Sequence, residues 1–565
     1  MRNIVIVDCI STGINYINDI IKRNFNPIVL ELRTYGSPDR VESRRKTLLS
    51  EYASIDSEFE IIYEKDSYEE TLEMVRKFDP LLVLPGNERG VETATRLADD
   101  LGLLGASAEL LPYMTQKDQM QMALKKAGLR YIRGKVIHSV EEAVKFYDEE
   151  GLDEVVVKPV LSAGSFGVTI CKNKDEMIDA ITSNLGSIST YADKELGLVV
   201  QEKINGTEYI VNTVSNNGVH RVTLIWKYYK VKTREGNQIY DFMESVNELD
   251  IAQAEMVEYA YDVADAIGIQ YGPIHGEYMI DDKGPVLIEV NCRPCGGHMA
   301  AEFLDKISGQ HETDSILDSY LDEERFNRER LKPYRLYGHG GLKFFIVPED
   351  LMAESIPMQN IAERLPSHFK TSLPTLENGH QFFPKTIDLD NAGGIIYLCH
   401  EDKAVVRKDL DYLRSVEQNA FSQIISSGED KVHEKKDNAT DIRKLLIDFG
   451  SKISGTALLV SEEDIGMDNI VHCDINGLDD VPNDFDTVII DLDESLIGKD
   501  DYQISLLILD IINKVKVGGI IAIPQKTYQY IAGGRNGMEA LVKALNLRIE
   551  LPLYGVKNVI FASKS

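Results

Sequence analysis

Residues 276–298, GEYMIDDKGPVLIEVNCRPCGGH, constrain the fold and chemistry of this chain more than any other segment. Apolar residues alternate on both sides of a turn-forming cluster at 281–284, which predicts two antiparallel strands joined by a tight turn. Such a turn brings Glu277 close to Glu289. Glu289 and Asn291 are two residues apart on one strand, so we expect their side chains on the same face of the sheet.

Two carboxylates and an amide supply oxygen ligands, which suit a hard cation such as Mg2+ or Mn2+. Arg293 is predicted on the same face, and a metal beside a guanidinium is typical of phosphoryl transfer, which needs charge neutralisation and alignment. Taken alone, the motif also fits a hairpin with solvated acidic residues. The motifs found elsewhere in the chain favour the metal site.

The chain has 565 residues, enough for three or four domains, and a formal net charge of -31. This charge argues against nucleic acid or an anionic membrane as the main partner. No N-terminal signal-like apolar segment and no run of about 18 apolar residues occurs, so we expect a cytoplasmic enzyme.

Six scattered cysteines do not suggest a disulfide framework. Only Cys292 and Cys295 form a CxxC pair, and no second pair stands at a spacing suited to zinc. We expect these two to pack the loop that follows the metal-site strand.

Residues 1–112 alternate short apolar strands with helical segments, which predicts a parallel sheet covered by helices. The turn Ser11-Thr12-Gly13 after the first strand fits either an anion site or a plain strand-to-helix turn. Glu88 follows the fourth strand. It fits either a contact with a substrate amine or a cap on the next helix.

The region 113–200 is predicted to begin with a helix at 115–128 that carries Lys117 in its first turn, where a lysine opposes the helix dipole and implies another partner. Lys158 ends an apolar strand, where an anion is the obvious partner. The small-residue loop at 161–168 contains Ser162, Gly164 and Ser165, and its backbone N–H groups suit phosphates.

The region 201–425 is expected to hold the remaining strands of the site. The strand end Gln201-Glu202-Lys203-Ile204 suits an adenine edge through its backbone, and Glu208 suits ribose hydroxyls. A polar loop at 230–238 fits a lid or a merely mobile connection, and 249–268 reads as one core helix. Further strands are predicted in 336–348, 393–400 and 403–414.

Residues 426–441 are polar and charge-rich and are predicted to be a linker. A second α/β unit, Rossmann-like, is expected over 442–565.

These motifs stand in the order of the ATP-grasp superfamily: Lys117, the Lys158 strand, the Ser/Gly loop, QEKINGTE, and GEYM followed by LIEVNCRP. Over about residues 1–425 the chain most resembles the L-amino-acid ligases, which are carboxylate–amine ligases. The resemblance implies an α/β ATP-grasp architecture in which an N-terminal parallel domain precedes two α+β subdomains that grip ATP.

By this resemblance, each motif has a role. Lys117 and Lys158 would contact ATP phosphates, the segment 201–204 adenine, and Glu208 ribose. Glu277, Glu289 and Asn291 would bind Mg2+ or Mn2+, and Arg293 would steady the transferring phosphate. Phe166 replaces a residue that is often polar in the family, which puts only a side-chain contact in doubt.

The implied reaction joins a small-molecule carboxylate to an amine, both expected to be amino acids, through an acyl phosphate. The loop at 296–298 is positioned to touch the acyl donor. Two alternatives remain: an ATP-grasp kinase or carboxylase-type activator, and a nucleotide-binding regulatory protein. The chain is compatible with a homodimer.

The segment FDTVIIDLD with the later VGGIIAIP resembles the second half of class I methyltransferases. The first strand of this unit is followed by Ser461-Glu462-Glu463-Asp464 instead of a glycine-rich turn. We therefore expect a degenerate methyltransferase-like domain or a docking module.

Overall fold

The computed structural model describes residues 1–34, 38–160, 167–185, 197–232, 238–353, 361–373, 381–387, 389 and 392–421. Toward the end of the chain it describes 457–461, 470–473, 478, 481–482, 485–491, 511–512, 514–524, 542, 547–550 and 559–564. The Ser/Gly loop with Ser162, Gly164 and Ser165 lies outside these residues, as does the predicted linker at 426–441.

The N-terminal unit is the predicted α/β layer. Its four parallel strands lie in the order β3-β2-β1-β4, with apolar side chains buried on both faces because helices cover each side. Its elements are β1 (Asn3–Val7), η1 (Ser11–Ile14), α1 (Asn15–Lys22), β2 (Asn26–Glu31), α2 (Pro38–Tyr52), β3 (Glu60–Tyr63), α3 (Tyr68–Arg76), β4 (Pro80–Pro85), α4 (Gly90–Asp100), η2 (Ala108–Leu110) and α5 (Leu111–Thr115).

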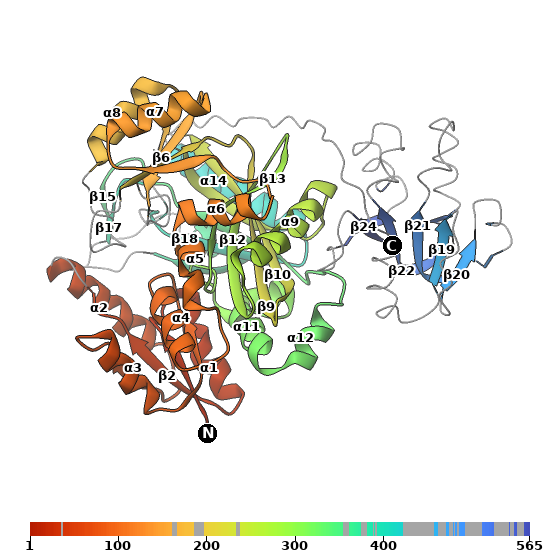
Figure 1. Cartoon of the computed structure of the whole chain (residues 1–565), viewed down its shortest axis with the longest axis horizontal. Helices are drawn as coiled ribbons and strands as arrows, with labels where there is room; N and C mark the ends of the chain where they lie inside the picture. Colours follow the sequence, from red (N-terminus) through yellow and green to blue (C-terminus); the bar gives the residue numbers. More distant parts are fainter. Residues whose placement is uncertain are drawn as a thin grey trace.

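A small antiparallel sheet of order β5-β8-β6-β7 follows, with α7 and α8 packed on it through a separate apolar cluster (Figure 1). The elements are α6 (Lys117–Lys126), β5 (Gly134–Ile137), α7 (Val140–Glu150), β6 (Val155–Pro159), β7 (Thr169–Cys171), α8 (Lys174–Asn184) and β8 (Leu198–Glu202). The predicted helix at 115–128 is confirmed as α6, which begins at Lys117 because Gln116 adopts an extended conformation after the short helix α5.

The centre of the molecule is an eight-stranded antiparallel sheet of order β13-β12-β9-β10-β11-β14-β18-β16. Its elements and the neighbouring β15–β17 pair are β9 (Thr207–Asn216), β10 (Val219–Lys232), β11 (Gln238–Ser245), α9 (Ile251–Ile267), β12 (Gly272–Asp281), β13 (Gly284–Asn291), α10 (Ala301–Ser308), α11 (Glu312–Leu321), α12 (Glu323–Glu329), β14 (His339–Phe344), β15 (Leu351–Ala353), β16 (His368–Ser372), β17 (Gln381–Phe383), β18 (Ile395–His400) and α14 (Lys403–Phe421).

The predicted core helix at 249–268 is confirmed as α9. Asp250 and Gln253 form a reciprocal capping box at its start, and Gly268 ends it with φ 87°. Strands β10 and β11 run further than expected, so the predicted lid shortens to a connection at 233–237, outside the described residues.

The prediction of a strand at 403–414 is wrong, because this segment belongs to α14. Val406, Leu410 and Leu413 are buried, at a spacing that places them on one side of a helix. Glu417, one turn further, forms an ion pair with the fully buried Lys343 at 2.7 Å. The adjacent valines at 405 and 406 favoured a strand locally, but the longer spacing of the apolar residues determines the structure.

The last unit contains a sheet of order β20-β19-β21-β22-β24-β23, in which β24 pairs antiparallel with both of its neighbours. The strands are β19 (Ala457–Ser461), β20 (Ile470–Cys473), β21 (Phe485–Asp491), β22 (Val515–Pro524), β23 (Leu547–Ile549) and β24 (Val559–Lys564). Most of the predicted helix at 501–516 and the turn after β19 lie outside the described residues.

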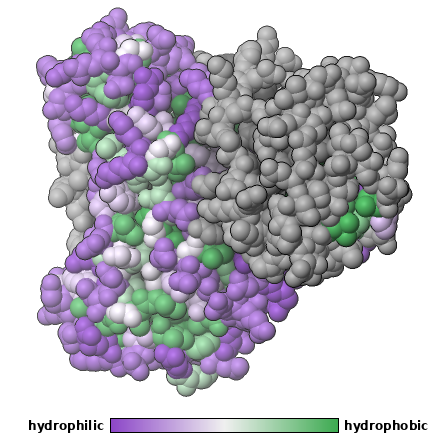
Figure 2. Space-filling model, turned by 45° about the vertical axis from the view of Figure 1, so that its right-hand side comes forward, coloured by the Kyte–Doolittle hydropathy of each residue, from purple (hydrophilic) through white to green (hydrophobic). Residues whose placement is uncertain are grey.

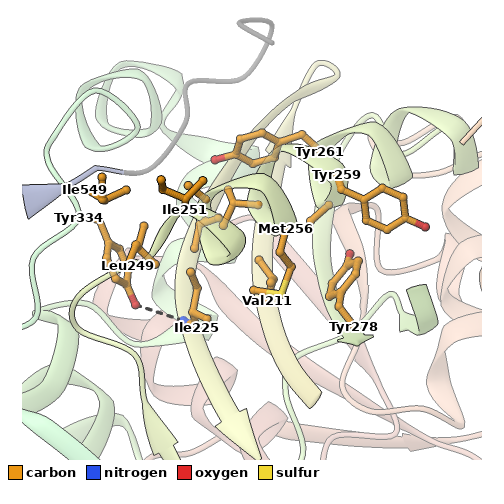
Figure 3. Close-up of a cluster of buried hydrophobic side chains, with 14 of the residues drawn as sticks. Val211, Ile225, Leu249, Ile251, Met256, Tyr259, Tyr261, Tyr278, Tyr334 and Ile549 are labelled. Carbon is orange, nitrogen blue, oxygen red and sulfur yellow. Dashed lines mark hydrogen bonds between the residues drawn. The ribbon is translucent and has the colours of Figure 1, made fainter. Parts of the chain in front are cut away.

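This unit contacts the rest of the molecule. Leu249 forms a β-bridge with Ile549, and both belong to one buried cluster that includes Tyr334 (Figure 3). Arg335 pairs with Glu550, and Arg548 Nη2 donates to the Asn247 carbonyl at 2.7 Å. The units before and after residues 426–441 therefore share an apolar contact.

The face in Figure 2 carries mostly hydrophilic side chains on its described part, with apolar side chains gathered toward the lower part of the view. Among the helices of the described residues, none is long and apolar enough to cross a membrane.

A buried ionic cluster fastens the N-terminal unit to the central sheet. His311 Nε2 lies 2.8 Å from Asp19 Oδ2, and its Nδ1 lies 2.9 Å from Asp305 Oδ1. Arg23 Nη2 on α1 bonds Asp318 on α11 at 2.8 Å. Burial opposes a charged His311, but Asp19 and Asp305 prevail and raise its pKa to about 9.

We predict that His311 stabilises the protein most below its ordinary pKa of about 6.5, and that this contribution disappears as the pH rises through about 9. This pKa shift corresponds to a contribution of His311 to the free energy of unfolding on the order of 2–3 kcal/mol. Melting temperatures of the parent and His311→Gln should differ clearly near pH 6 and converge near pH 9.5 or above. An unchanged difference across that range would contradict the assignment, since other titrations cancel in the comparison.

Candidate active site

The predicted hairpin is confirmed as β12 and β13, with Glu277 directly opposite Glu289 and His275 opposite Asn291. The register shifts between Glu277 and Tyr278, and bulges of this kind often re-aim side chains next to active sites. These four polar residues line a cavity of about 690 Å³, together with Arg293.

Two lysines from the neighbouring unit reach this carboxylate pair. Lys117 Nζ lies 2.8 Å from Glu289 Oε2 and is almost fully buried. Burial raises the pKa of both glutamates, but Lys117 and Lys158 reverse the effect at Glu289 and lower its pKa, whereas at Glu277 the charge of Glu289 raises it further. Glu289 is therefore the ionised member of the pair.

Lys158 ends β6, lines the cavity and is 6% exposed. Within the described part of the chain, no carboxylate lies within ion-pair distance of it. Burial, and then the charge of Lys117, lowers the pKa of Lys158 to about 8. A buried cation held this way favours an anionic ligand, as its position at a strand end predicts.

Glu88 does not cap the helix that follows it, and its carboxylate instead bonds Arg293 and Asn291 at the cavity. Arg293 Nε donates to Glu88 Oε2 at 3.1 Å, and the Asn291 amide, oriented to donate, lies 2.8 Å from the same oxygen. Helix α4 has no side-chain N-cap. Glu88 thus ties the N-terminal unit to the arginine and the amide of the predicted phosphate site.

Sequence reasoning missed His275. Its Nδ1 lies 2.8 Å from Asn212 Oδ1 and its Nε2 lies 3.7 Å from Glu277 Oε1. Burial and then Arg293 lower the pKa of His275 to about 3, so the ring is neutral. The proton on Nδ1 therefore serves the Asn212 oxygen, and Nε2 faces Glu277 without a proton. His275 is two residues before Glu277 on the same strand, so both side chains are expected on one face of the sheet. This spacing is the sequence signal that could have identified His275.

The predicted adenine segment borders the cavity, and its side chains have distinct partners. Glu202 bonds Arg133 Nη2 at 2.7 Å, and Lys203 bonds Glu154 at 2.8 Å. Their backbone N–H groups donate to the carbonyls of Arg133 and Glu154. These two residues therefore have only their backbone carbonyl oxygens to offer to a base. The Ile204 N–H donates none of the hydrogen bonds found among the described residues.

Gln201 lines the same wall, buried, with its Nε2 lacking a hydrogen-bond partner among the described residues. Glu208 accepts from Lys230 Nζ at 2.7 Å and from the Tyr240 hydroxyl at 3.2 Å. Lys230 is a second residue that the sequence did not single out, and it places a positive charge on this wall.

The turns after β1 and β4 close the other end of the cavity. The two turns pack backbone to backbone at Gly13 and Gly86. Glycine is required at position 13 because a Cβ there would lie 2.0 Å from the Gly86 carbonyl oxygen. At the Ser11 turn, which fits either an anion site or a plain strand-to-helix turn, Ser11 N donates to the Glu51 carboxylate at 2.9 Å. Thr12 Oγ1 accepts from Met299 N at 3.0 Å, which holds the loop after β13.

The donor set fits a magnesium ion that completes its shell with phosphate and water. Within the described residues no group of three or more His, Cys, Asp or Glu side chains could hold a metal. Two carboxylates with an amide suit Mg2+, which is usually bound by one or two carboxylates plus substrate phosphates. Cys292 and Cys295 are buried, as expected for packing residues.

Comparisons with known proteins agree with this geometry. Residues 153–302 match the family model of the ATP-grasp domain. Dapdiamide A synthase from Enterobacter agglomerans is 23% identical over 361 residues, 62% of this chain and 83% of that protein. The carbamoyl phosphate synthase large chain of Deinococcus radiodurans is 30% identical over 170 residues, which are 26% of this chain and 16% of that protein.

Solved structures extend the likeness beyond the ATP-grasp model. An L-amino acid ligase from Bacillus licheniformis superposes with a TM-score of 0.56 at 16% identity, covering 76% of this chain and 99% of that one. An N5-carboxyaminoimidazole synthase from Aspergillus clavatus gives a TM-score of 0.54 at 13% identity, covering 74% and 99%. At these identities the likeness establishes the mixed α/β ATP-grasp fold.

We predict that Glu289→Gln lowers the rate of ADP formation by about 100-fold or more, because an electrostatic group at a phosphoryl-transfer site is worth about 3 kcal/mol. Asp281→Asn is the matched control on the same hairpin, since Asp281 bonds Arg130 and does not line the cavity. ADP release should survive in the control. Equal losses in both variants would assign Glu289 a structural role only.

Lys158→Ala should raise the Michaelis constant for ATP by about 10-fold or more through loss of a charge-assisted phosphate contact. Lys203→Ala is the control, because Lys203 also follows a strand at the cavity but is held by Glu154. In the parent, ATP binding should weaken above about pH 8 as Lys158 loses its proton. An ATP response that is the same in Lys158→Ala and the parent would refute the contact.

Proposed function

We propose that this chain is an ATP-dependent ligase that joins a carboxylate to an amine through an acyl phosphate, and that both substrates are amino acids. The observation that carries the proposal is the cluster of Glu277, Glu289, Asn291 and Arg293 on one hairpin, with Lys117 and Lys158 facing it across a single cavity. Dapdiamide A synthase and the L-amino acid ligase, whose names describe such ligations, support the choice of reaction.

ATP is proposed to lie between the small β5–β8 sheet and the central sheet. Gln201 and the Ile204 N–H would meet the adenine edge, together with the carbonyls of Glu202 and Lys203. Glu208 would meet the ribose, positioned by Lys230. Ser162, Gly164 and Ser165 are proposed to close over the phosphates, from a loop outside the described residues.

In phosphoryl transfer, Lys117, Lys158 and Arg293 are proposed to neutralise the charge on the phosphates and align the carboxylate oxygen with the γ-phosphorus. Glu277, Glu289 and Asn291 would hold Mg2+ or Mn2+, which supplies further charge neutralisation when bound. Because His275 is neutral, it adds no charge to the cluster and orients Asn212 or Glu277 instead.

In the second step the amine nitrogen attacks the acyl carbonyl carbon, the carbon–oxygen bond to phosphate breaks, and the nitrogen loses a proton. The departing phosphate accepts this proton, since Glu277 is proposed to hold the metal ion. The loop 296–298 is proposed to border the acyl group.

The carboxyl-terminal unit is proposed to be a methyltransferase-like docking module without cofactor binding. Its sheet order, with β24 antiparallel between β22 and β23, supports such a fold. The carboxylates in Ser461-Glu462-Glu463-Asp464 would repel the carboxylate of S-adenosylmethionine. Calorimetric binding of S-adenosylmethionine to the full chain would overturn this part of the proposal.

A regulatory protein without turnover has less support, because a protein that only binds a nucleotide has no need of two buried carboxylates beside an arginine. A carboxylase-type activator would use the same first step, so the test must follow the carboxylate and the product together.

We expect ADP release only when an amino-acid carboxylate is present, and a product whose mass equals the two substrates less one water. With 18O in the substrate carboxylate, one label should appear in the released phosphate, because that oxygen bridges carbon and phosphorus in the acyl phosphate. ADP release with no label in phosphate and no condensed product would refute the ligase.

A further inference from the structure

One end of the cavity lies over the carboxyl ends of β1 and β4, outside the predicted ATP and metal site. Strand β1 has β2 on one side and β4 on the other, so the chain order reverses between β1 and β4. Ligands of open parallel sheets bind at such a switch point. Ser11, Arg44, Asn87 and Arg89 line the cavity here.

The two arginines are held in place from behind by one buried carboxylate. Arg44 on α2 forms an ion pair with Asp8, and Arg89 Nη1 lies 3.9 Å from the same Asp8 oxygen. Asp8 has no exposed surface and does not line the cavity, whereas both guanidinium groups do. Two guanidinium groups therefore face the cavity, with Asp8 behind both of them and Glu31 Oε2 4.0 Å from Arg44.

Donors in this corner remain available to a ligand. Arg44 Nε and Asn87 Nδ2 are buried and have no hydrogen-bond partner among the described residues. Asp8, Ser11 and His298 all have positive φ, at 58°, 58° and 49°. Non-glycine residues in this conformation are strained and concentrate at ligand sites.

The nearby acidic residues Asp8 and Glu31 each keep one buried carboxylate oxygen, Oδ2 and Oε2, without a hydrogen-bond partner among the described residues. Glu31 accepts from the Tyr52 hydroxyl, and Glu51 accepts from Ser11 N; neither lines the cavity. Glu88 does line it and is bonded to Arg293. The corner favours an anion because two guanidinium groups and an amide line the cavity there, whereas Asp8, Glu31 and Glu51 do not.

We propose that Arg44, Arg89 and Asn87 bind the carboxylate of the amine substrate, which makes that substrate an amino acid held by its own acid group. The inference rests on the proposed ligase function. The acyl donor uses its carboxylate at the metal site, whereas an amino-acid acceptor keeps its carboxylate through the reaction and needs a second anion site. Glu88, next to Arg89 in sequence, and its partner Arg293 both line the same cavity.

The test compares two acceptors in the full-length enzyme: the best amino acid found by condensation assay, and its primary carboxamide. Hydroxylamine provides a third acceptor, small and uncharged, which converts the acyl phosphate to a hydroxamate. We expect the parent to prefer the amino acid over the carboxamide by about 10- to 100-fold in kcat/KM, as loss of a charge-assisted contact implies.

Arg89→Met and the paired variant Asp8→Asn/Arg44→Met should reduce this preference to near unity, mainly by raising KM for the amino acid. The paired variant avoids leaving Asp8 charged and buried without its partner. In both variants the loss in amino-acid condensation should exceed the loss in hydroxamate formation by about 10-fold or more.

Three outcomes separate the possibilities. A parent enzyme that forms no hydroxamate and no condensed product refutes the ligase itself. Normal hydroxamate formation with no preference for the free carboxylate refutes only the acceptor site. A rise in KM for the carboxylate substrate in the hydroxamate assay would assign the arginines to the acyl donor and overturn the proposal.

Discussion

The pairing of Glu277 with Glu289 across β12 and β13 is the constraint on which the site depends. Two buried carboxylates at opposed positions repel each other, so both cannot be charged without nearby cations. Lys117 is one such cation, with its Nζ 2.8 Å from Glu289 Oε2. The negative charge that remains on the pair favours a metal ion that also binds phosphate. In the proposed function, ATP and its cation offset this repulsion when they bind.

The rest of the molecule brings positive charge to this pair from separate units. Helix α6 and strand β6 carry the two lysines, and the N-terminal sheet contributes Glu88, which orients Arg293. The close packing of Gly13 on Gly86 allows the turns after β1 and β4 to approach each other and the loop at 296–299. Catalytic geometry here is a property of three packed units, so the buried cluster at His311 matters for the site although it lies away from it.

Short-range patterns predicted much of the fold, because strands of alternating or fully apolar residues and helices with caps are local features. The hairpin register followed from the turn, and the N-terminal parallel sheet from its βα alternation. Contacts such as Arg293 with Glu88, 205 positions apart, leave no local signal, and neither does the pairing of Glu208 with Lys230. At 403–414 two adjacent valines outweighed the helical spacing of Val406, Leu410 and Leu413, and the predicted strand was wrong.

The balance of charged residues around the cavity differs from that of the whole chain. The chain has 61 lysines and arginines against 92 aspartates and glutamates. Among the described residues, those lining the cavity reverse this balance, with the seven cations Arg44, Arg89, Lys117, Lys158, Lys203, Lys230 and Arg293 against the five glutamates Glu88, Glu202, Glu208, Glu277 and Glu289. Because screening limits the surrounding negative field to about 8 Å at physiological salt, the local excess governs binding once a ligand is inside. A protein of negative net charge can thus favour a polyanion such as ATP inside this one cavity.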